Sequence, residues 1–184
     1  LVINKVDSAK PESLNLVRAN IAKHNPKALV IEAACDVSVS DPGLIKGKRV
    51  LVVEDGPTLT HGEMAYGAGV VAANRFKAAK MVDPRPYAVG SIRTTYEKFP
   101  HLRSVLPAMG YSETQRRELE ETIANVPCDL VLVATPVDLA RVIRLTQPSV
   151  RVSYEIEEMG TPAFSELLEK FTEERRPACA ANGR

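Results

Sequence analysis

The sequence of 184 residues contains no tryptophan, and aromatic residues make up only 5% of it. Proteins that bind single-stranded nucleic acid stack the bases on aromatic side chains, so this scarcity argues against that class. An excess of one charge is also missing, because 24 basic residues face 23 acidic ones and leave a net charge of +1. We therefore expect no nucleic-acid partner and no membrane partner, although a local anion site is compatible with this balance.

Cysteine is scarce as well. The three cysteines, Cys35, Cys128 and Cys179, are odd in number, widely spaced and form no C-x-x-C pair. This pattern argues against a disulfide framework and against a zinc site, and it favours reduced thiols in the cytoplasm. No apolar run reaches the length of a transmembrane helix, and no signal peptide is recognisable. An apolar share of 45% and a charged share of 26% are ordinary for a soluble globular protein.

A phosphate-binding loop is missing too. No G-x-x-x-x-G-K-[ST] motif occurs anywhere in the chain, and no D-x-x-G precedes its first polar loop. There is no initiator methionine, and residue 1 already lies within an apolar, strand-like run. We therefore expect this chain to be the C-terminal part of a longer protein. On its own it should neither hydrolyse a nucleotide nor transfer phosphate from one.

What the chain does contain is a regular alternation of short apolar segments and helical patterns. The expected strands span 1–3, 28–34, 49–57, 80–84, 104–110, 128–138 and 149–158, the last as a half-exposed edge strand; the expected helices span 11–24, 62–78, 91–100, 112–126, 138–145 and 161–176. Such alternation predicts an α/β fold, with an open, mostly parallel sheet and helices on both faces. Ligand-binding groups then collect in the loops that follow the carboxyl ends of the strands.

The first of these loops carries an N-K-x-D tetrad. Asn4, Lys5 and Asp7 directly follow the apolar strand and precede a helix for which Ser8 offers an N-cap. A carboxylate can accept two hydrogen bonds from guanine, and a lysine stem can cover the face of the base. The next strand ends in "IEAA", where related GTPases place a second loop that contacts the base. We therefore interpret the three residues as nucleotide-binding; the alternative is an ordinary polar loop.

The densest polar cluster begins at the acidic and turn residues that end the strand expected at 49–57. Glu54 and Asp55 are an adjacent acidic pair that could hold Mg²⁺ or act as acid and base. Thr58, Thr60 and His61 come next, before a helix expected from residue 62, where hydroxyls and backbone N–H groups could meet an anion. His61 could also transfer a proton or accept a phosphate. The alternative is a helix capped by Thr60 with solvated acids.

The loop after the next strand, "DPRPYAVGS", holds a second set of candidates. Arg85 stands between two prolines, and a fixed guanidinium can clamp a phosphate or a carboxylate with two hydrogen bonds. Tyr87 lies close by, and Ser91 follows Gly90 at a helix start that could form an anion nest. Lys98 lies farther along the same segment and His101 follows it. A plain surface arginine in a proline-rich turn explains the same letters about equally well.

Two further strand-end loops, 107–111 and 135–141, show weaker signals. Thr135 could cap the helix expected after it, or it could take part in a site. Asp138 and Arg141 are three residues apart on one helix face, so we expect them to pair with each other.

Taken together, these stretches resemble one family over residues 1 to about 171. "INKVD", "GKRVLVVEDGPTLTHGEMAYGAG", "VDPRPYAVGSI", "YEKFPHL", "VLPAMGY", "TPVDLARVI" and "VRVSYEIEE" are similar to the C-terminal part of the cyclic 2,3-diphosphoglycerate synthetases, a P-loop GTPase-like family. The long stretch around "EDGPTLTHG" is the distinctive part. The absent phosphate loop and a tetrad typical of guanine both depart from an enzyme of this family that uses ATP.

The resemblance implies a ligase that uses ATP and Mg²⁺ to close a small phosphorylated substrate, 2,3-diphosphoglycerate, into an intramolecular phosphoanhydride. It implies catalytic roles among His61, Glu54, Asp55 and Arg85, with Asp55 as a Mg²⁺ ligand. Substrate binding would fall to a second group: Thr58, Thr60, Arg85, Tyr87, Ser91 and Lys98. ATP and GTP remain open as the nucleotide, as does self-association.

The resemblance also suggests how the chain is divided. Residues 1–47 would end a nucleotide-binding domain of the P-loop type, 48–176 would form an α/β substrate and catalytic domain, and 177–184 would be a disordered tail. Two other functions stay open. One is a GTPase of the same family with a regulatory or metallochaperone-like role, and the other is a free-standing binding domain whose tetrad has no nucleotide role.

Overall fold

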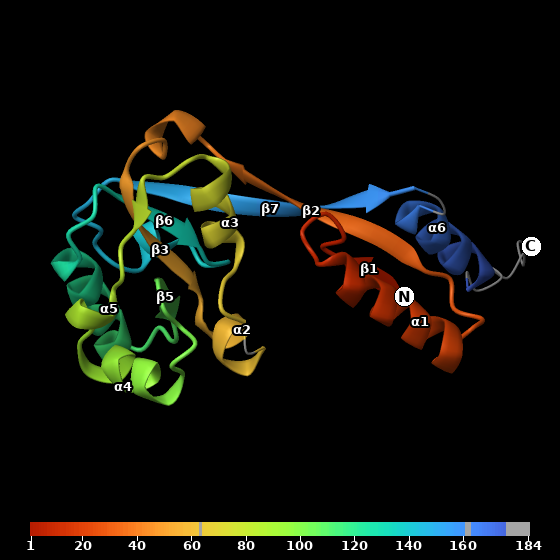
Figure 1. Ribbon diagram of the computed structural model, residues 1–184, viewed down its shortest axis with the longest axis horizontal. Helices are drawn as coiled ribbons and strands as arrows, with labels where there is room; N and C mark the ends of the chain where they lie inside the picture. The colour runs from red at the N-terminus through yellow and green to blue at the C-terminus, as the bar shows by residue number, and fades with distance from the viewer. Residues whose placement is uncertain (63, 161–162, 176–184) are drawn as a thin grey trace, which may run out of the picture. The chain divides into compact units, whose positions relative to one another are not determined.

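The computed structural model describes residues 1–62, 64–160 and 163–175, and it divides the chain into two compact units. Unit 1 combines residues Leu1–Asp36 with Glu155–Arg184, and unit 2 spans Val37–Tyr154 (Figure 1). The predicted domain boundary after residue 47 stays a prediction, and the predicted tail at 177–184 lies outside the described residues. No helix among the described residues has the length and apolarity needed to cross a membrane.

The sheet of unit 2 is built around β3 (Arg49–Asp55). β4 (Lys80–Met81) pairs with the beginning of β3, and β5 (Val105–Ala108) pairs with its end. β6 (Leu130–Ala134) also pairs with β3, and β7 (Ser149–Met159) pairs with β6. All of these pairings are parallel, so the carboxyl ends of β3, β5 and β6 lie at one edge of the sheet.

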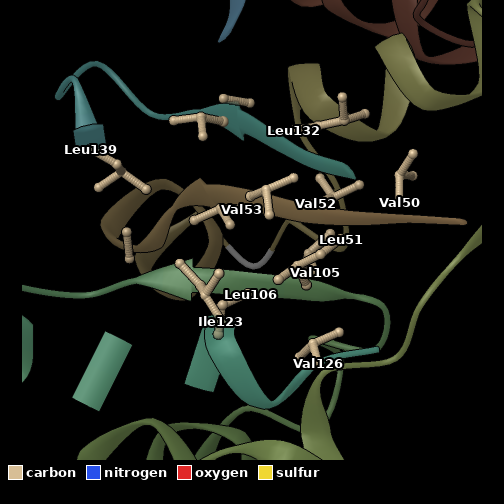
Figure 2. Packing of buried hydrophobic residues seen from close by; sticks show 14 of the residues in the cluster. Val50, Leu51, Val52, Val53, Val105, Leu106, Ile123, Val126, Leu132 and Leu139 are labelled. Atoms are coloured by element: carbon tan, nitrogen blue, oxygen red, sulfur yellow. The ribbon is translucent and has the colours of Figure 1, made fainter. Parts of the chain in front are cut away.

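The core of unit 2 lies on both faces of β3. Val50, Leu51, Val52 and Val53 are all 0% exposed, because side chains from neighbouring strands and helices cover them (Figure 2). A strand covered on both faces reads as a continuous apolar run, which is why the sequence predicts this strand well.

The described residues of unit 2 form the α-helices α2 (Gly56–His61), α3 (Ala68–Arg75), α4 (Gly90–Lys98) and α5 (Glu113–Asn125) beside this sheet. In Figure 1, α3 lies on one side of the sheet, and α4 and α5 lie on the other. Single turns of 3-10 helix occur at Pro42–Leu44, Arg85–Tyr87 and Leu139–Arg141. The predicted α/β fold, with a mostly parallel sheet and helices on both faces, is confirmed.

Unit 1 is smaller. β1 (Val2–Asn4) pairs in parallel with the first part of β2 (Ile31–Val39), in the register Val2 to Ile31 and Asn4 to Ala33. α1 (Pro11–His24), the last part of β7 and α6 (Phe164–Glu174) complete it. β2 and β7 are neighbours in the strand order, and both strands carry the chain from one unit to the other.

Several local predictions are wrong. β2 does not end at "IEAA" but continues to Val39, because residues 35–39 alternate apolar and polar side chains as a strand does. β7 stands between β6 and β2 in the strand order rather than at an edge. The N-cap of α1 is Lys10 and makes no side-chain cap, so Ser8 does not have the role expected of it.

Candidate functional site

The tetrad lies in unit 1, in the turn that follows β1. Lys5 has a left-handed backbone with φ of 63°, and its N–H donates to the Asn4 side chain at 2.8 Å. One carboxylate oxygen of Asp7 accepts a hydrogen bond from the backbone N–H of Cys35 on β2 at 3.1 Å. The asparagine and the aspartate therefore shape the loop and tie it to β2. Nucleotide binding by Asn4, Lys5 and Asp7 stays a prediction.

The second base-contacting loop expected after "IEAA" does not exist. Cys35 lies within β2, where its N–H is already engaged by Asp7. A continuous strand directs its backbone N–H groups along the sheet and not towards a ligand.

In unit 2, the predicted cluster at 54–61 folds differently from the expectation. α2 begins at Gly56 and not near residue 62, so Thr58, Thr60 and His61 lie inside the helix. Asp55 is the N-cap and accepts from the Thr58 N–H at 3.2 Å and from the Thr58 hydroxyl at 2.5 Å. The expected anion position at the start of this helix is therefore filled by Asp55 itself.

The other two predicted site residues in α2, Thr60 and His61, make hydrogen bonds within the helix. The buried Thr60 hydroxyl donates to the carbonyl oxygen of Gly56 at 3.0 Å. The Nδ1 atom of His61 lies 3.2 Å from the Pro57 carbonyl oxygen, and the ring is exposed. The exposed ring of His61 is accessible from solvent, and its proposed acid–base role stays a prediction.

Glu54 occupies a second helix start. Its side chain is only 3% exposed, and one carboxylate oxygen accepts from the backbone N–H groups of Gly67, Gly69 and Val70 at 3.1, 2.9 and 3.1 Å. These donors belong to the N-terminus of α3, which favours a negative charge. A Cβ atom at Gly67 would lie 2.4 Å from the carboxylate, so a glycine is needed for this approach. The geometry gives Glu54 the role of anchoring α3 to β3.

A third helix start, that of α4, is also filled by a carboxylate. Gly90–Ser91 forms the anion nest that the sequence suggests, and Glu118 of α5 enters it. The Ser91 N–H donates to Glu118 at 3.0 Å, and the Ser91 hydroxyl donates to the same oxygen. Ser91 is therefore engaged within the protein. Glu118 lies 27 residues away in the sequence, and no local pattern identifies it as the partner.

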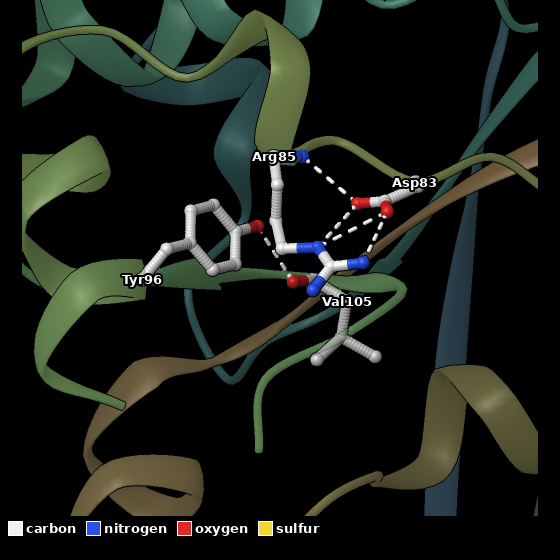
Figure 3. Close-up of polar contacts among 4 residues, drawn as sticks. All are labelled: Asp83, Arg85, Tyr96 and Val105. Carbon is white, nitrogen blue, oxygen red and sulfur yellow. Dashed lines mark hydrogen bonds and ion pairs between the residues drawn. The ribbon is translucent and has the colours of Figure 1, made fainter. Parts of the chain in front are cut away.

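Arg85 is held as rigidly as predicted, but by a partner that the sequence reading missed. Asp83 accepts from Nε of Arg85 at 2.9 Å, from the second terminal nitrogen at 2.6 Å and from the Arg85 N–H at 3.0 Å (Figure 3). Hydrogen bonds from the guanidinium lower the pKa of Asp83, and the same pairing raises the pKa of Arg85. The charge of Arg85 is therefore largely balanced. Tyr96 points to the same region but donates to the Val105 carbonyl oxygen at 2.7 Å.

The remaining candidates of this segment each contact other residues of unit 2. Tyr87 is half-buried and packs against the core of unit 2. Lys98 is exposed, with its ammonium group 5.3 Å from the centre of the Phe99 ring. Nε2 of His101 lies 3.1 Å from the Leu59 carbonyl oxygen, which makes it the hydrogen-bonded, half-buried histidine that is common in proteins.

Strand pairing brings a different group together at the carboxyl edge of the sheet. The ladders place Asp55 beside Ala108 at the end of β5, and Glu54 beside Ala134 at the end of β6. Tyr111 and Thr135 follow these two strands. Burial raises the pKa of the Tyr111 phenol, a hydrogen bond with Thr135 lowers it, and the Asp55 carboxylate raises it further. The sequence reading missed Tyr111, although its position one turn after a strand end is the signal that could have found it.

The structure shows which contacts Thr135, Asp138 and Arg141 make. The Thr135 side chain is 3% exposed and donates to the Val137 carbonyl oxygen at 2.6 Å, so it does not cap a helix. Asp138 and Arg141 pair at 3.2 Å, as predicted. Arg151 also approaches Asp138, at 3.9 Å.

Metal binding has little support from side-chain clustering. Among the described residues, no three His, Cys, Asp or Glu side chains gather closely enough to hold a metal ion. Mg²⁺ often takes only one or two carboxylates and completes its shell with water and phosphate oxygens. Asp55 has the right chemistry for such a partial site, and its role as a Mg²⁺ ligand stays a prediction.

A comparison with known proteins finds a relative that shares most of this chain. No protein-family model matches the chain. The chain is 58% identical over 171 residues, or 93% of its length, to a protein of Thermococcus kodakarensis named arginine synthetase ArcE. It spans only 38% of the length of that relative. The resemblance to cyclic 2,3-diphosphoglycerate synthetases stays a prediction. The chain is therefore similar, over nearly all of its length, to part of a larger protein with the name of a ligase.

Proposed function

We propose that this chain is part of a nucleotide-dependent ligase of the arginine synthetase kind, with arginine or a close relative of it as the amino-acid ligand. The observation that carries the proposal is the 58% identity over 93% of the chain to a protein named arginine synthetase. The remaining 62% of that relative, which the chain does not span, is where we place the residues that hold the nucleotide phosphates.

The charge arrangement of unit 2 supports this choice over a diphosphoglycerate-forming enzyme. Three helix starts that could each bind a phosphate hold the protein's own carboxylates instead, namely Asp55, Glu54 and Glu118. The fixed guanidinium of Arg85 is engaged by Asp83. A substrate with two phosphates needs several unbalanced donors in one place, whereas Arg85 and the three helix starts are internally neutralised and leave only the exposed His61, Thr58 and Lys98 of the predicted set.

An acidic carboxyl edge suits a cationic ligand better. Asp55 directs one oxygen to Thr58 and lies near the Tyr111 phenol. A carboxylate with a neighbouring hydroxyl is a standard partner for a guanidinium or an ammonium group. We assign Asp55 and Tyr111 to ligand binding at this edge, with Thr135 as the residue that orients the phenol.

For the nucleotide, we propose that Asn4, Lys5 and Asp7 contact the base and that ATP or GTP enters as a Mg²⁺ complex. The tetrad follows the carboxyl end of a parallel strand, which is where open α/β sheets bind their ligands. His61, Thr58 and Lys98 are exposed groups that we keep as candidates for substrate contact.

The test is ligand binding by the full-length protein. Melting temperature would be measured with arginine, 2,3-diphosphoglycerate, ATP or GTP, each alone and in pairs. A ligand at 100 times its Kd stabilises the native state by about 2.7 kcal/mol, which is readily detected. We expect arginine to raise the melting temperature, and more strongly when a nucleotide is present. Stabilisation by 2,3-diphosphoglycerate but not by arginine would favour a cyclic 2,3-diphosphoglycerate synthetase instead. Stabilisation by GTP alone would favour the GTPase.

A matched pair of variants locates the site. Asp55→Asn should weaken arginine binding by about tenfold or more, since a charge-assisted hydrogen bond contributes roughly 1.5–3 kcal/mol. Asp36→Asn is the control, because it makes the same change on β2 outside the carboxyl edge of unit 2. Equal affinities in the two variants would contradict the role of Asp55.

A further inference from the structure

The surface of unit 1 is unusual in how much apolar area it leaves uncovered. Neither α1 nor α6 has a single buried residue, and the buried apolar side chains of unit 1 lie on β1 and β2. Most of the large apolar side chains that are exposed in the described residues belong to this smaller unit: Leu1, Val2, Leu16, Val17, Leu29, Ile156, Met159, Phe164, Leu168 and Phe171. Single exposed apolar residues are ordinary, but a concentration of this kind marks an interaction surface.

On α6 the exposed residues form a stripe. Phe164, Leu168 and Phe171 recur at spacings of four and three, so they lie on one face of the helix. Their exposed fractions are 44%, 47% and 48%. An amphipathic helix gains its stability by burying such a face, and the described residues of unit 1 do not cover it.

Apolar side chains near Leu1 are also left uncovered by the described residues of unit 1. Leu1 and Leu29 lie together, because the Leu1 backbone nitrogen donates to the Leu29 carbonyl oxygen at 2.7 Å, and both residues are more than half exposed. β1 stands at one end of the strand order among the described residues, next to β2. An edge strand with exposed apolar side chains is a place where a further strand can add.

A hollow lies between these elements. It has a volume of about 500 Å³ and is lined by α1, residues 25–30, β1 and β2, with Met159 at the end of β7. The lining is mixed, because apolar side chains such as Ile3 and Ile21 alternate with polar groups. The ion pair of Arg18 and Glu32, at 2.6 Å, forms one wall. All of its lining residues belong to unit 1. A mixed lining of this kind suits a polypeptide segment, which brings apolar side chains together with backbone donors and acceptors.

We infer that this surface of unit 1 is the docking face for the rest of the same polypeptide, which adds a strand at β1 and covers the stripe of α6. The inference rests on the part of the proposed function that places the chain within a larger enzyme. The length of the relative supplies the occupant, because 93% of this chain corresponds to only 38% of that protein. A second copy of the chain and an unrelated partner are the competing occupants.

Photo-crosslinking of the full-length protein identifies the occupant. A benzoylphenylalanine placed at Leu168 reports on the stripe, and one placed at Glu169, about 100° farther around the same helix, reports on a side outside the stripe. We expect the probe at Leu168 to give an intramolecular crosslink to a peptide outside residues 1–184, and the probe at Glu169 to give none. A covalent dimer would show that a second copy covers the face. That result would overturn the inference, as would the absence of any crosslink or equal crosslinking from both positions.

Hydrogen exchange gives a second, independent measurement. In the full-length protein, Leu168→Gln should speed amide exchange in α6 by about tenfold or more, since local protection follows the packing of the segment. Glu169→Gln introduces the same residue one position away and should leave α6 within about twofold of the parent protein. Equal exchange in both variants would overturn the inference. Neither measurement uses a substrate, so a failure to bind arginine would reject the proposed function alone.

Discussion

At the scale of single residues, the ion pair of Arg49 and Asp129 gives a prediction about protonation. Asp129 accepts from the Arg49 guanidinium at 2.7 Å and from the Arg49 N–H at 2.8 Å. These hydrogen bonds lower the pKa of Asp129 to about 2. Because the folded pKa lies below the unfolded value of roughly 3.9, the pair stabilises the fold above that value, and the contribution is lost as the pH falls from about 4 towards 2.

An NMR titration of the Asp129 carboxyl carbon would measure this effect. In Arg49→Gln the pKa should rise but stay below its usual value, because the backbone N–H still donates to the carboxylate. Lys48→Gln is the control and should change the pKa much less, since Lys48 is the weakest of the contributing causes. A normal pKa in the parent protein, or equal shifts in the two variants, would contradict the prediction.

Glu54 gives a prediction about stability. Its charge lies at the N-terminus of α3, where three backbone N–H groups converge on one oxygen. Glu54→Gln keeps the shape but removes the charge, and a hydrogen bond to a charged group contributes more than one to a neutral group. We expect a loss of about 1–3 kcal/mol in the free energy of unfolding. Urea denaturation followed by circular dichroism would measure it, because the chain has no tryptophan.

The matched control for Glu54→Gln is Glu97→Gln, an exposed position on α4. Surface substitutions of this kind usually change stability by less than about 0.5 kcal/mol. If the two variants unfold at the same urea concentration, the anchoring role of Glu54 is wrong.

At the scale of secondary-structure elements, α5 carries the clearest local signal. Ser112 accepts from the Gln115 N–H, and the Gln115 side chain accepts from the Ser112 N–H, both at 3.3 Å, which completes a capping box. Ser112→Ala should cost about 1 kcal/mol of unfolding free energy, whereas Thr114→Ala in the same turn should cost little. Urea denaturation of both variants would test this, and equal midpoints would reject it.

An element can be predicted from the sequence when residues close to it in the chain determine where it begins and ends. The strands β3 and β6 and the start of α5 follow from neighbouring residues, so apolar runs and a capping serine identified them. The start of α2 was missed because Gly56–Pro57 resembles a turn, although proline is also favoured in the first turn of a helix. The occupied start of α4 could not be read, since Glu118 reaches it from another helix.

The candidate site divides in the same way. Sequence spacing placed Asp55 directly after a buried strand, at the edge where such sheets bind ligands, and its role there stays a prediction. It could not show that Glu54, the residue before Asp55, turns into the protein, where its carboxylate accepts hydrogen bonds from the N-terminus of α3. Nor could it show that Arg85 is paired, because the order of residues does not reveal that the carboxylate of Asp83, two positions earlier, turns towards the guanidinium. Glu54 and Asp55 point to opposite faces at the end of one strand, so one is buried and the other is not. Only the packing around them reveals which carboxylate is accessible to a ligand.

At the scale of the whole molecule, the two units differ in how complete they are. Unit 2 has a continuous core around β3, with residues that are fully buried on both faces. Unit 1 is assembled from both ends of the chain, and its helices bury no residue of their own. A reading along the chain divides it into consecutive segments, whereas this grouping depends on contacts between residues more than a hundred positions apart.

This difference predicts unequal stability within the chain of 184 residues. Hydrogen exchange in dilute urea separates amides that exchange by local opening from those that require global unfolding. Amides of β3 and β6 should exchange slowly and respond strongly to urea, because exposing them unfolds the core of unit 2. Amides of α1 and α6 should exchange much faster and respond weakly, because few buried apolar contacts hold these helices. Protection of α1 equal to that of β3 would mean that unit 1 is complete without the rest of the polypeptide, and it would remove the physical reason for a docking face on that unit.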